Sequence, residues 1–378
     1  MANAWKEVAW IAAEAVNYMQ DALTVTRLAA KDKSAEFNNT ANGYAKGSEV
    51  DIRTNPVYET KEFTTAIQTQ DIRSSSRKLK IEKHFDISVA MTAKEKRLDF
   101  EDFSTQIIKP AAYSMAEKMD RYVASKILNA QGIYTSATLF QTAADMALAK
   151  KAATFQQLSP TGRFCLVNDT LEAQLLGATF FSTYANRGDG GESVFREGSM
   201  GRAMGMDFYS SLQLPTDVPT FGTAVGVTNN AGNANLVGLT VLTSTAITGT
   251  AKVGDRLLVA GVRRPLVVGV QANAGATAIT LAHPITDIIP TGAAITVIGS
   301  GATGSFMGAI FDDSSLAFAA PMLDPASDKP SSVISDNGYS MRVVQGYDMT
   351  AKTETISIDA LCGAEVWDPR RITLLYDI

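Results

Sequence analysis

Residues 218–304 restrict the possible folds most, because they are rich in Gly, Ala, Thr and Val and carry only six charged side chains. Short β-branched runs alternate there with Gly, Asn and Pro turns at intervals of about 8–12 residues, as in small barrels and sandwiches. The flanks, residues 201–215 and 305–321, have ordinary mixed composition. We therefore interpret residues 218–304, hereafter the low-charge segment, as a β-rich domain inserted into a host.

Strands of the low-charge segment are expected at 239–242, 246–248, 256–260, 265–270, 278–281 and 294–298. An inserted domain whose ends are close together costs little loop-closure entropy. Two roles are open for it: a folding and stability unit within the subunit, or a strut between neighbouring subunits. The sparse charges favour the first role, because they offer few ion pairs for lateral contacts. In the second role, Arg263 and Arg264 or Asp287 would bridge neighbours.

The composition limits the class of protein. The 378-residue chain is 46% hydrophobic, which allows a sizeable core and suggests two or three structural units. Charged residues make up 19%, below the roughly 25% typical of soluble domains, which fits a surface that partners cover. The net charge of -5 argues against a dedicated nucleic-acid-binding protein. Cys165 and Cys362 lack metal-type spacing and are predicted to be buried thiols.

Helical periodicity is clear in the host sequence. An amphipathic helix is predicted at 5–23, where interspersed carboxylates exclude a signal peptide. No run is long enough to cross a membrane. A second stripe predicts a long helix within 100–129, with Pro110 in its first turn or at a kink. Further elements are expected as a helix at 142–155, a strand at 163–167 and a short helix ending near residue 176.

Strand periodicity is clearest at 79–91, where apolar and polar residues alternate. Val50 and Ile52 indicate a short edge strand, and the polar run 73–78 is interpreted as a turn. Its three cations indicate a solvated loop tip, or a contact with an acidic neighbouring surface. Such a hairpin cannot bury both faces alone, so we expect it to lie on a partner subunit. With a further strand at 355–360, the host is α+β.

Four segments carry a resemblance to a known family. The run FDISVAMTAKEKRLDFEDFSTQIIKPAAYSMAEKMD at 85–120 resembles the strand-to-spine-helix junction in major capsid proteins of tailed double-stranded DNA bacteriophages. Three further stretches agree in order: GRAMGMDFYSSLQLP at 201–215, TGTAKVGDRLLVAGV at 248–262 and LCGAEVWDPRR at 361–371. The subgroup that the chain resembles is the podovirus coat-protein family, which has an inserted β domain.

The resemblance implies the Hong Kong 97-like capsid fold, α+β in class, with a small inserted β-barrel. The implied parts are an N-terminal arm at 1–35, an extended loop and long strand at 36–97, the spine helix of the peripheral domain at 98–137, the axial domain at 138–215 and 305–340, the inserted barrel at 216–304, and the returning strand of the peripheral domain with the C-terminus at 341–378.

The resemblance also implies a function. Pentamers and hexamers of the chain would close an icosahedral shell, the virion capsid, around double-stranded DNA that they contact non-specifically. Scaffolding protein and portal are further expected partners, no membrane is expected, and assembly would take place in the host bacterial cytoplasm. The N-terminal helix, beside a polar hinge at 38–43, is expected to move between the precursor and the mature shell.

No catalytic, cofactor-binding or metal site is expected. The run GSGATG at 299–304 matches the dinucleotide spacing, yet no helix is predicted to open after it, so we interpret it as a linker. The only two histidines, His84 and His283, cannot form a His-rich metal site, and His84 is expected at the surface. Asp312 and Asp313 are interpreted as helix-cap or surface groups.

Two alternatives to a viral shell are open. An encapsulin-type nanocompartment shares the fold but packages protein cargo, and it should lack the inserted domain. A hydrolase or nucleotide-dependent enzyme with a β accessory domain is the other alternative. The scarcity of histidine and the isolated glycine motif count against the enzyme.

Overall fold

The computed structural model describes residues 2–31, 49–53, 62–63, 76–92, 104–156, 158–179, 200–228 and 235–378. Its contacts divide the chain into two compact units. Unit 1 comprises residues 1–52, 78–126 and 316–365, and unit 2 comprises 53–77, 127–315 and 366–378. The low-charge segment therefore lies within unit 2, and the stretch 316–340 lies in unit 1.

Unit 1 is built on a five-stranded sheet. Its longest strand, β18 (Thr353–Val366), pairs with β17 (Tyr339–Asp348) and with β3 (Lys83–Thr92), antiparallel in both cases. β16 (Ser331–Asp336) pairs with β17, and β15 (Leu316–Ala319) neighbours β18. The strand predicted at 355–360 is thus confirmed as part of β18, which pairs with a strand on each side.

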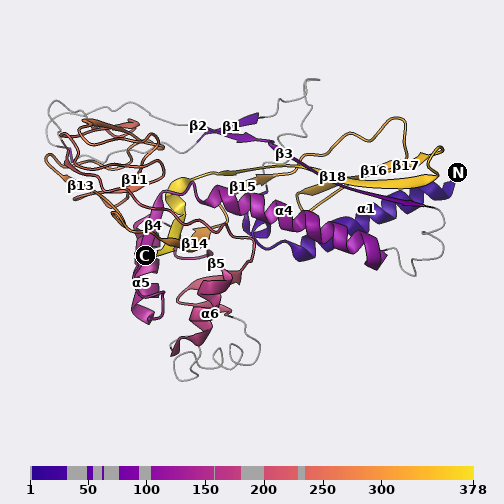
Figure 1. The fold of residues 1–378 in the computed structure, drawn as a ribbon, viewed down its shortest axis with the longest axis horizontal. Coiled ribbons are helices and arrows are strands. Elements are labelled where there is room, and N and C mark those ends of the chain that lie inside the picture. Colours follow the sequence, from indigo (N-terminus) through magenta and orange to yellow (C-terminus); the bar gives the residue numbers. More distant parts are fainter. Residues whose placement is uncertain are drawn as a thin grey trace. The chain divides into compact units, whose positions relative to one another are not determined.

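Two helices lie along one side of the unit 1 sheet (Figure 1). They are α1 (Ala2–Ala22) and α4 (Lys109–Ile127), the latter preceded by the π-helical turn η2 (Ser104–Ile108). The stripe that α1 buries at helical spacing consists of Val8, Ile11, Ala12, Ala15, Val16 and Met19. Both predicted helices are confirmed, and Pro110 lies in the first turn of α4, directly after the π-helical turn η2.

Asp120 ties the end of α1 to α4 within unit 1. Its side chain is buried, and its two oxygens accept four hydrogen bonds from the chain that follows α1. The donors are the amides of Thr24 (2.7 Å), Val25 (3.2 Å) and Thr26 (2.8 Å), and the Thr26 hydroxyl (2.6 Å). A buried carboxylate needs such donors, because an unpaired one would lose its solvation without compensation.

The predicted hairpin differs from the observed structure. β1 (Glu49–Arg53) pairs with β2 (Ser76–Lys80), but the single strand predicted at 79–91 is wrong, because it is divided between β2 and β3. At the break, Glu82 leaves the ladder to bind the Lys126 ammonium at 3.0 Å. The predicted turn at 73–78 overlaps β2, and the stretches 54–61 and 64–75 lie outside the described residues.

Unit 2 contains a six-stranded mixed sheet in the order β4-β19-β14-β5-β7-β6. Its strands are β4 (Gly132–Ser136), β5 (Arg163–Val167), β6 (Arg202–Ala203), β7 (Met206–Ser210), β14 (Ser305–Asp312) and β19 (Thr373–Asp377). β19 runs parallel to β4, and β5 runs parallel to β7. The C-terminal strand therefore inserts between strands from the middle of the chain.

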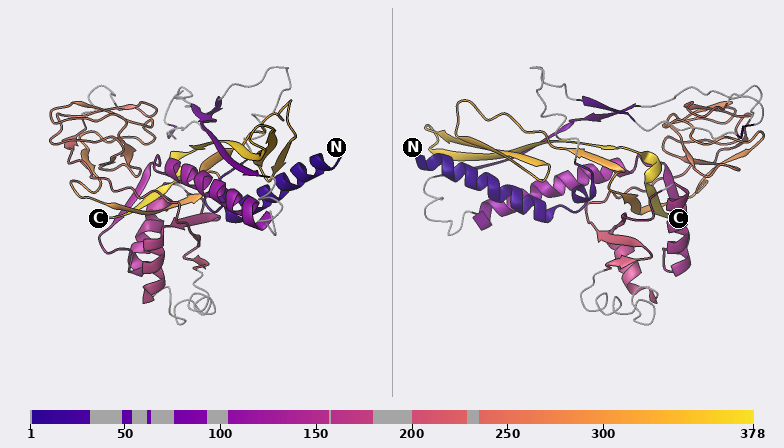
Figure 2. Two further views of the ribbon diagram at one scale, coloured as in Figure 1. Left: turned by 45° about the vertical axis from the view of Figure 1, so that its right-hand side comes forward. Right: turned by 180° about the vertical axis from the view of Figure 1, so that it is seen from behind.

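Two helices cover the six-stranded sheet, α5 (Ala143–Phe155) and α6 (Asp169–Gly177), as Figure 2 shows. The side chains of Thr142 and Asn168 cap them by accepting from the amides of Asp145 and Leu171. Their core includes Phe140, Met146, Leu171, Ile310 and Leu375. The helices and the strand predicted between residues 142 and 176 are confirmed.

The low-charge segment is β-rich. Its strands are β8 (Val225–Val227), β9 (Val241–Thr243), β10 (Arg256–Val259), β11 (Leu266–Val267), β12 (Ala278–Thr280) and β13 (Ala294–Val297). They form one sheet in the order β11-β10-β13-β8 and a second of β12 and β9. Residues 246–248 make only an isolated bridge, at Thr248, so the strand predicted there is wrong. The closed barrel stays a prediction.

Candidate functional site at the end of the long helix

The carbonyls that follow α4 are bound by side chains of the low-charge segment. The last carbonyls of a helix have no donor within the helix and need partners. One guanidinium nitrogen of Arg256, Nη2, donates to the carbonyl oxygens of Leu128 and Ala130, each at 2.8 Å. The ring nitrogen Nε2 of His283 lies 3.3 Å from the carbonyl oxygen of Asn129. We call Leu128, Asn129, Ala130, Arg256, His283 and Arg77 the helix-end joint.

Arg256 is the first residue of β10 and is buried. Its Nη1 donates to the Gly254 carbonyl at 2.5 Å, so the guanidinium binds three carbonyls in all. Burial lowers the pKa of Arg256, while Tyr376, Asp255 and Asp217 act in the opposite direction. A cation close to a helix C-terminus is electrostatically favourable. The joint therefore compensates for the burial of a charge in an otherwise charge-poor segment.

Asp255, next to Arg256, organises the turn that leads into β10. Its Oδ2 accepts hydrogen bonds from the amides of Gly222 (3.0 Å) and Lys252 (2.6 Å). Burial raises the pKa of this carboxyl. A Cβ atom at residue 222 would lie 2.3 Å from the Thr250 carbonyl oxygen, so only glycine fits there. Asp255 thereby holds the chain at Gly222 against the turn at Lys252, directly next to Arg256.

Arg77 brings the start of β2 to the joint. Its Nη2 lies 2.6 Å from Nδ1 of His283, and its Nη1 donates to the Val366 carbonyl at 3.2 Å. A guanidinium can only donate, so Nδ1 must accept and the ring proton must be on Nε2, directed at Asn129. Burial, and then the Arg77 charge, lower the pKa of His283 to about 4. The interpretation of this cation as a solvated loop tip is wrong.

Gln131 adds a second connection between the chain after α4 and the low-charge segment. Its side-chain amide donates to the Pro265 carbonyl at 2.7 Å, and its backbone amide donates to the Pro369 carbonyl at 2.8 Å. The low-charge segment thus holds residues 128–131 through Arg256, His283 and Pro265. These bonds make it part of the packing of unit 2.

The charged residues singled out as bridges to neighbours lie in different environments. Arg264 is buried, and the charges that act on it are Asp287, Arg370 and Asp368 of the same chain. Arg263 is exposed. Asp287, the third candidate, is half-buried, and a bridge to a neighbouring subunit stays a prediction.

Asp312 is not the surface or cap group that we expected. It is buried at the end of β14 and forms an ion pair with Arg371 at 2.5 Å. It also accepts hydrogen bonds from the hydroxyls of Ser314 and Ser315. The interpretation is wrong because the returning C-terminal chain, remote in the sequence, supplies the counter-charge.

The other groups considered from the sequence show no reactive arrangement within the part of the chain that the structure describes. Cys165 and Cys362 are free and buried as predicted, and burial raises the pKa of each thiol to about 12. Among the described residues, no group of three or more His, Cys, Asp or Glu could hold a metal. The strand β14, and not a helix, follows the glycine run at 299–304, so the dinucleotide-binding context is absent there. None of the helices within the described ranges is long and apolar enough to span a membrane.

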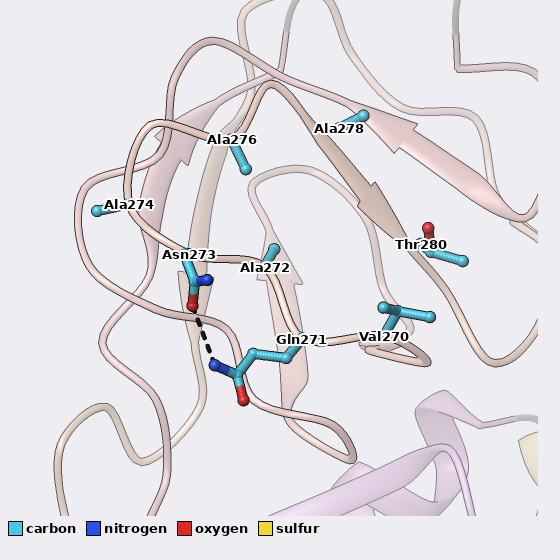
Figure 3. A pocket seen from close by; sticks show the side chains of 8 residues that line it. All are labelled: Val270, Gln271, Ala272, Asn273, Ala274, Ala276, Ala278 and Thr280. Atoms are coloured by element: carbon cyan, nitrogen blue, oxygen red, sulfur yellow. Dashed lines mark hydrogen bonds between the residues drawn. The ribbon is translucent and has the colours of Figure 1, made fainter.

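A shallow hollow in the low-charge segment lies between residues 270 and 280 (Figure 3). Alanines form half of its lining, and the side-chain amide of Gln271 donates to Asn273 at 3.0 Å across one edge. None of its lining residues carries a charge. The hollow offers no group that would fix an ionic ligand.

Sequence reasoning did not find the helix-end joint. The sequence pattern places Arg77 in a turn, raises His283 only as a possible metal ligand, and marks Arg256 only as one of the few charges of the low-charge segment. One signal was present, because a lone Arg among the aliphatic residues of a predicted strand must either face solvent or find buried acceptors. The acceptors themselves are backbone carbonyls more than a hundred residues away, which no pattern could indicate.

No family model matches the sequence, and no curated protein matches it. Among solved structures, one from Mycobacterium phage Che8 is similar with a TM-score of 0.54 and 12% identity, over 93% of this chain and 90% of that chain.

The chain has the Hong Kong 97-like phage capsid fold.

Capsid structures of Cyanophage P-SCSP1u (TM-score 0.49, 15% identity, 88% of this chain and 84% of that chain) and of bacteriophage PhiM1 (0.47, 11%, 88% and 82%) are also similar. The fold class predicted from the sequence is confirmed. The podovirus subgroup and the inserted barrel remain predictions.

Proposed function

We propose that this chain is the major capsid protein of a tailed double-stranded DNA bacteriophage, and that its pentamers and hexamers close an icosahedral shell. One observation carries the proposal: the similarity in fold to the Che8 structure over 93% of the chain. The four sequence segments that resemble the family, in the same order, support it independently. The role is structural, and assembly takes the place of a chemical step.

The surfaces of both units support an assembling protein. Met349 in unit 1 and Leu212 in unit 2 are 82% and 76% exposed, and Trp10 and Val218 are also exposed. Exposed apolar side chains of this kind are typically covered at protein–protein interfaces. In a shell, neighbouring copies of the chain would cover them, which also fits the low charge content.

Within such a subunit, the low-charge segment acts as a folding and stability unit. The support is the helix-end joint, where the segment contacts the carbonyls of Leu128, Asn129 and Ala130 through Arg256 and His283. Arg264, one candidate for a bridge to a neighbour, is buried within its own chain. Charge reversal at Arg263 should therefore leave the rate of assembly and the particle size unchanged.

The proposed partners follow from the shell role. Copies of the chain form the capsomers, scaffolding protein and portal take part in assembly in the host cytoplasm, and DNA is held inside without sequence recognition. A net charge of -5 suits that last role, because a strongly basic inner wall would bind the incoming duplex and slow its movement.

Electron microscopy of the purified full-length chain tests the proposal. Closed shells are expected, and only monomers or small oligomers would support the enzyme alternative instead. Native particles should contain DNA that nuclease cannot reach. Particles that contain protein cargo and no DNA would favour the encapsulin-type nanocompartment.

A further inference from the structure

His283 is the point where three stretches of chain, far apart in sequence, meet. Nδ1 is bound by Arg77 from β2, Nε2 points to Asn129 after α4, and the ring itself belongs to the low-charge segment. We propose that His283 is an acid-sensitive switch, in which a proton gained by Nδ1 disconnects Arg77 and opens the helix-end joint. This inference concerns the fold of unit 2 and does not depend on the proposed function.

The geometry makes the neutral ring essential for the contact. Nδ1 accepts from Arg77 only while it carries no proton, because a protonated imidazole has donors at both nitrogens. In the imidazolium, an N–H group would face the guanidinium N–H of Arg77 across the present 2.6 Å. Two donors, both on cations, cannot share this distance, so one of them must move away.

The groups around the ring do not compensate for that added charge. The cations facing it are Arg77 on β2 and Arg256 on β10, and the other neighbours are the backbone carbonyls of Asn129 and Ala282. Among the described residues, no carboxylate lies within ion-pair distance of the ring. Protonation therefore adds a third positive charge to a half-buried site that holds two.

The direction of the pH effect follows from linkage. The pKa of His283 is about 4 in the closed joint, against an ordinary value of 6.5 once the ring is released. The open form binds the proton first as the pH falls, so the closed joint is fully stable above pH 6.5 and loses stability between 6.5 and 4. With these two values, the population of the open form at pH 5.5 should rise about tenfold over its value at neutral pH.

Hydrogen exchange of the full-length chain, corrected for intrinsic rates, tests this at pH 7.5 and 5.5. The reporters are the amides of residues 130–132, 281, 282 and 285, which the structure shows hydrogen-bonded to the carbonyls of Ile127, Pro369, Ile372, Thr240, Val267 and Leu239. We expect their protection to fall about tenfold in the wild-type chain at pH 5.5. His283→Asn keeps an acceptor for Arg77 but does not titrate, so its protection should change less than about twofold. His84→Asn, the matched control at the only other histidine, should behave as the wild type does.

Each outcome is decisive. An equal fall in His283→Asn and in the wild type would overturn the proposal, as would a wild-type chain whose protection does not change. If His283→Asn fails to fold at pH 7.5 by circular dichroism, His283→Gln takes its place, and the wild-type titration still stands alone as a test. Shell formation is measured separately by electron microscopy, so a failed switch and a failed capsid assignment are distinguishable.

Discussion

At the scale of single residues, two buried side chains determine how distant stretches of this chain are held. Arg256 carries a charge into unit 2 and satisfies it with three backbone carbonyls. Asp120 carries the opposite charge into unit 1 and satisfies it with three amides and a hydroxyl. Each binds several backbone groups at once, so a substitution that removes the charged group breaks several hydrogen bonds together.

Arg256→Met should destabilise unit 2 while keeping most of the side-chain volume. We expect the free energy of unfolding to fall by about 2–4 kcal/mol, because the carbonyls of Leu128 and Ala130 lose their donor. Urea denaturation of the unassembled chain measures this. Arg263→Met, seven residues away and exposed, is the matched control and should change stability by less than about 0.5 kcal/mol. Equal effects of the two substitutions would contradict the role given to Arg256.

Asp120→Asn should loosen the end of α1. The amide nitrogen of asparagine cannot accept, so at least one backbone amide of residues 24–26 loses its acceptor, at a cost of about 1–3 kcal/mol. Faster hydrogen exchange at residues 24–26 and a lower thermal midpoint are expected. Asp21→Asn, on the exposed side of α1, serves as the control and should leave both unchanged. No change at residues 24–26 in the Asp120 variant would show that the carboxylate is not the tether.

At the scale of elements, the periodic helices α1, α4 and α5 were predictable because each buries one stripe against a core. The break between β2 and β3 was not, because it depends on the contact of Glu82 with Lys126 and on pairing with β18, some 270 positions away. Glu82 lies on the polar face of the alternating pattern whether or not the strand breaks there, so alternation could not reveal where β2 ends. The strand at 163–167, in contrast, was predictable from its apolar run alone.

The helix-end joint shows the same limit for the candidate site. The local sequence shows that Arg256 and His283 are polar residues in an apolar segment, yet their acceptors are backbone carbonyls that follow α4. Every residue has a backbone carbonyl, so the sequence does not indicate which carbonyls these two side chains bind. Asp312 was assigned to the surface for a related reason, since its partner Arg371 comes from the far end of the chain.

The N-terminal helix is the element expected to move. α1 is amphipathic and joins the sheet of unit 1 through its buried stripe, and the polar stretch at 38–43 that was predicted as its hinge lies outside the described residues. We expect hydrogen exchange of residues 5–23 to differ between precursor and expanded particles, because a repositioned helix changes the groups that protect its amides. Equal protection in both particles would count against the movement.

The whole molecule is an α+β chain with the phage capsid fold, in which one buried charge in each unit, Arg256 or Asp120, is bound mainly by backbone groups of another stretch of chain. This arrangement leaves apolar side chains such as Leu212 and Met349 at the surface, where a shell would cover them. We therefore expect the chain to exist as many copies within a closed lattice.

An icosahedral reconstruction of particles purified with this chain is the most direct test. The account predicts rings of five and six copies, each with the fold described here, in a closed shell that contains double-stranded DNA. A homogeneous monomer or small oligomer that forms no shell at any protein concentration or salt condition would contradict it.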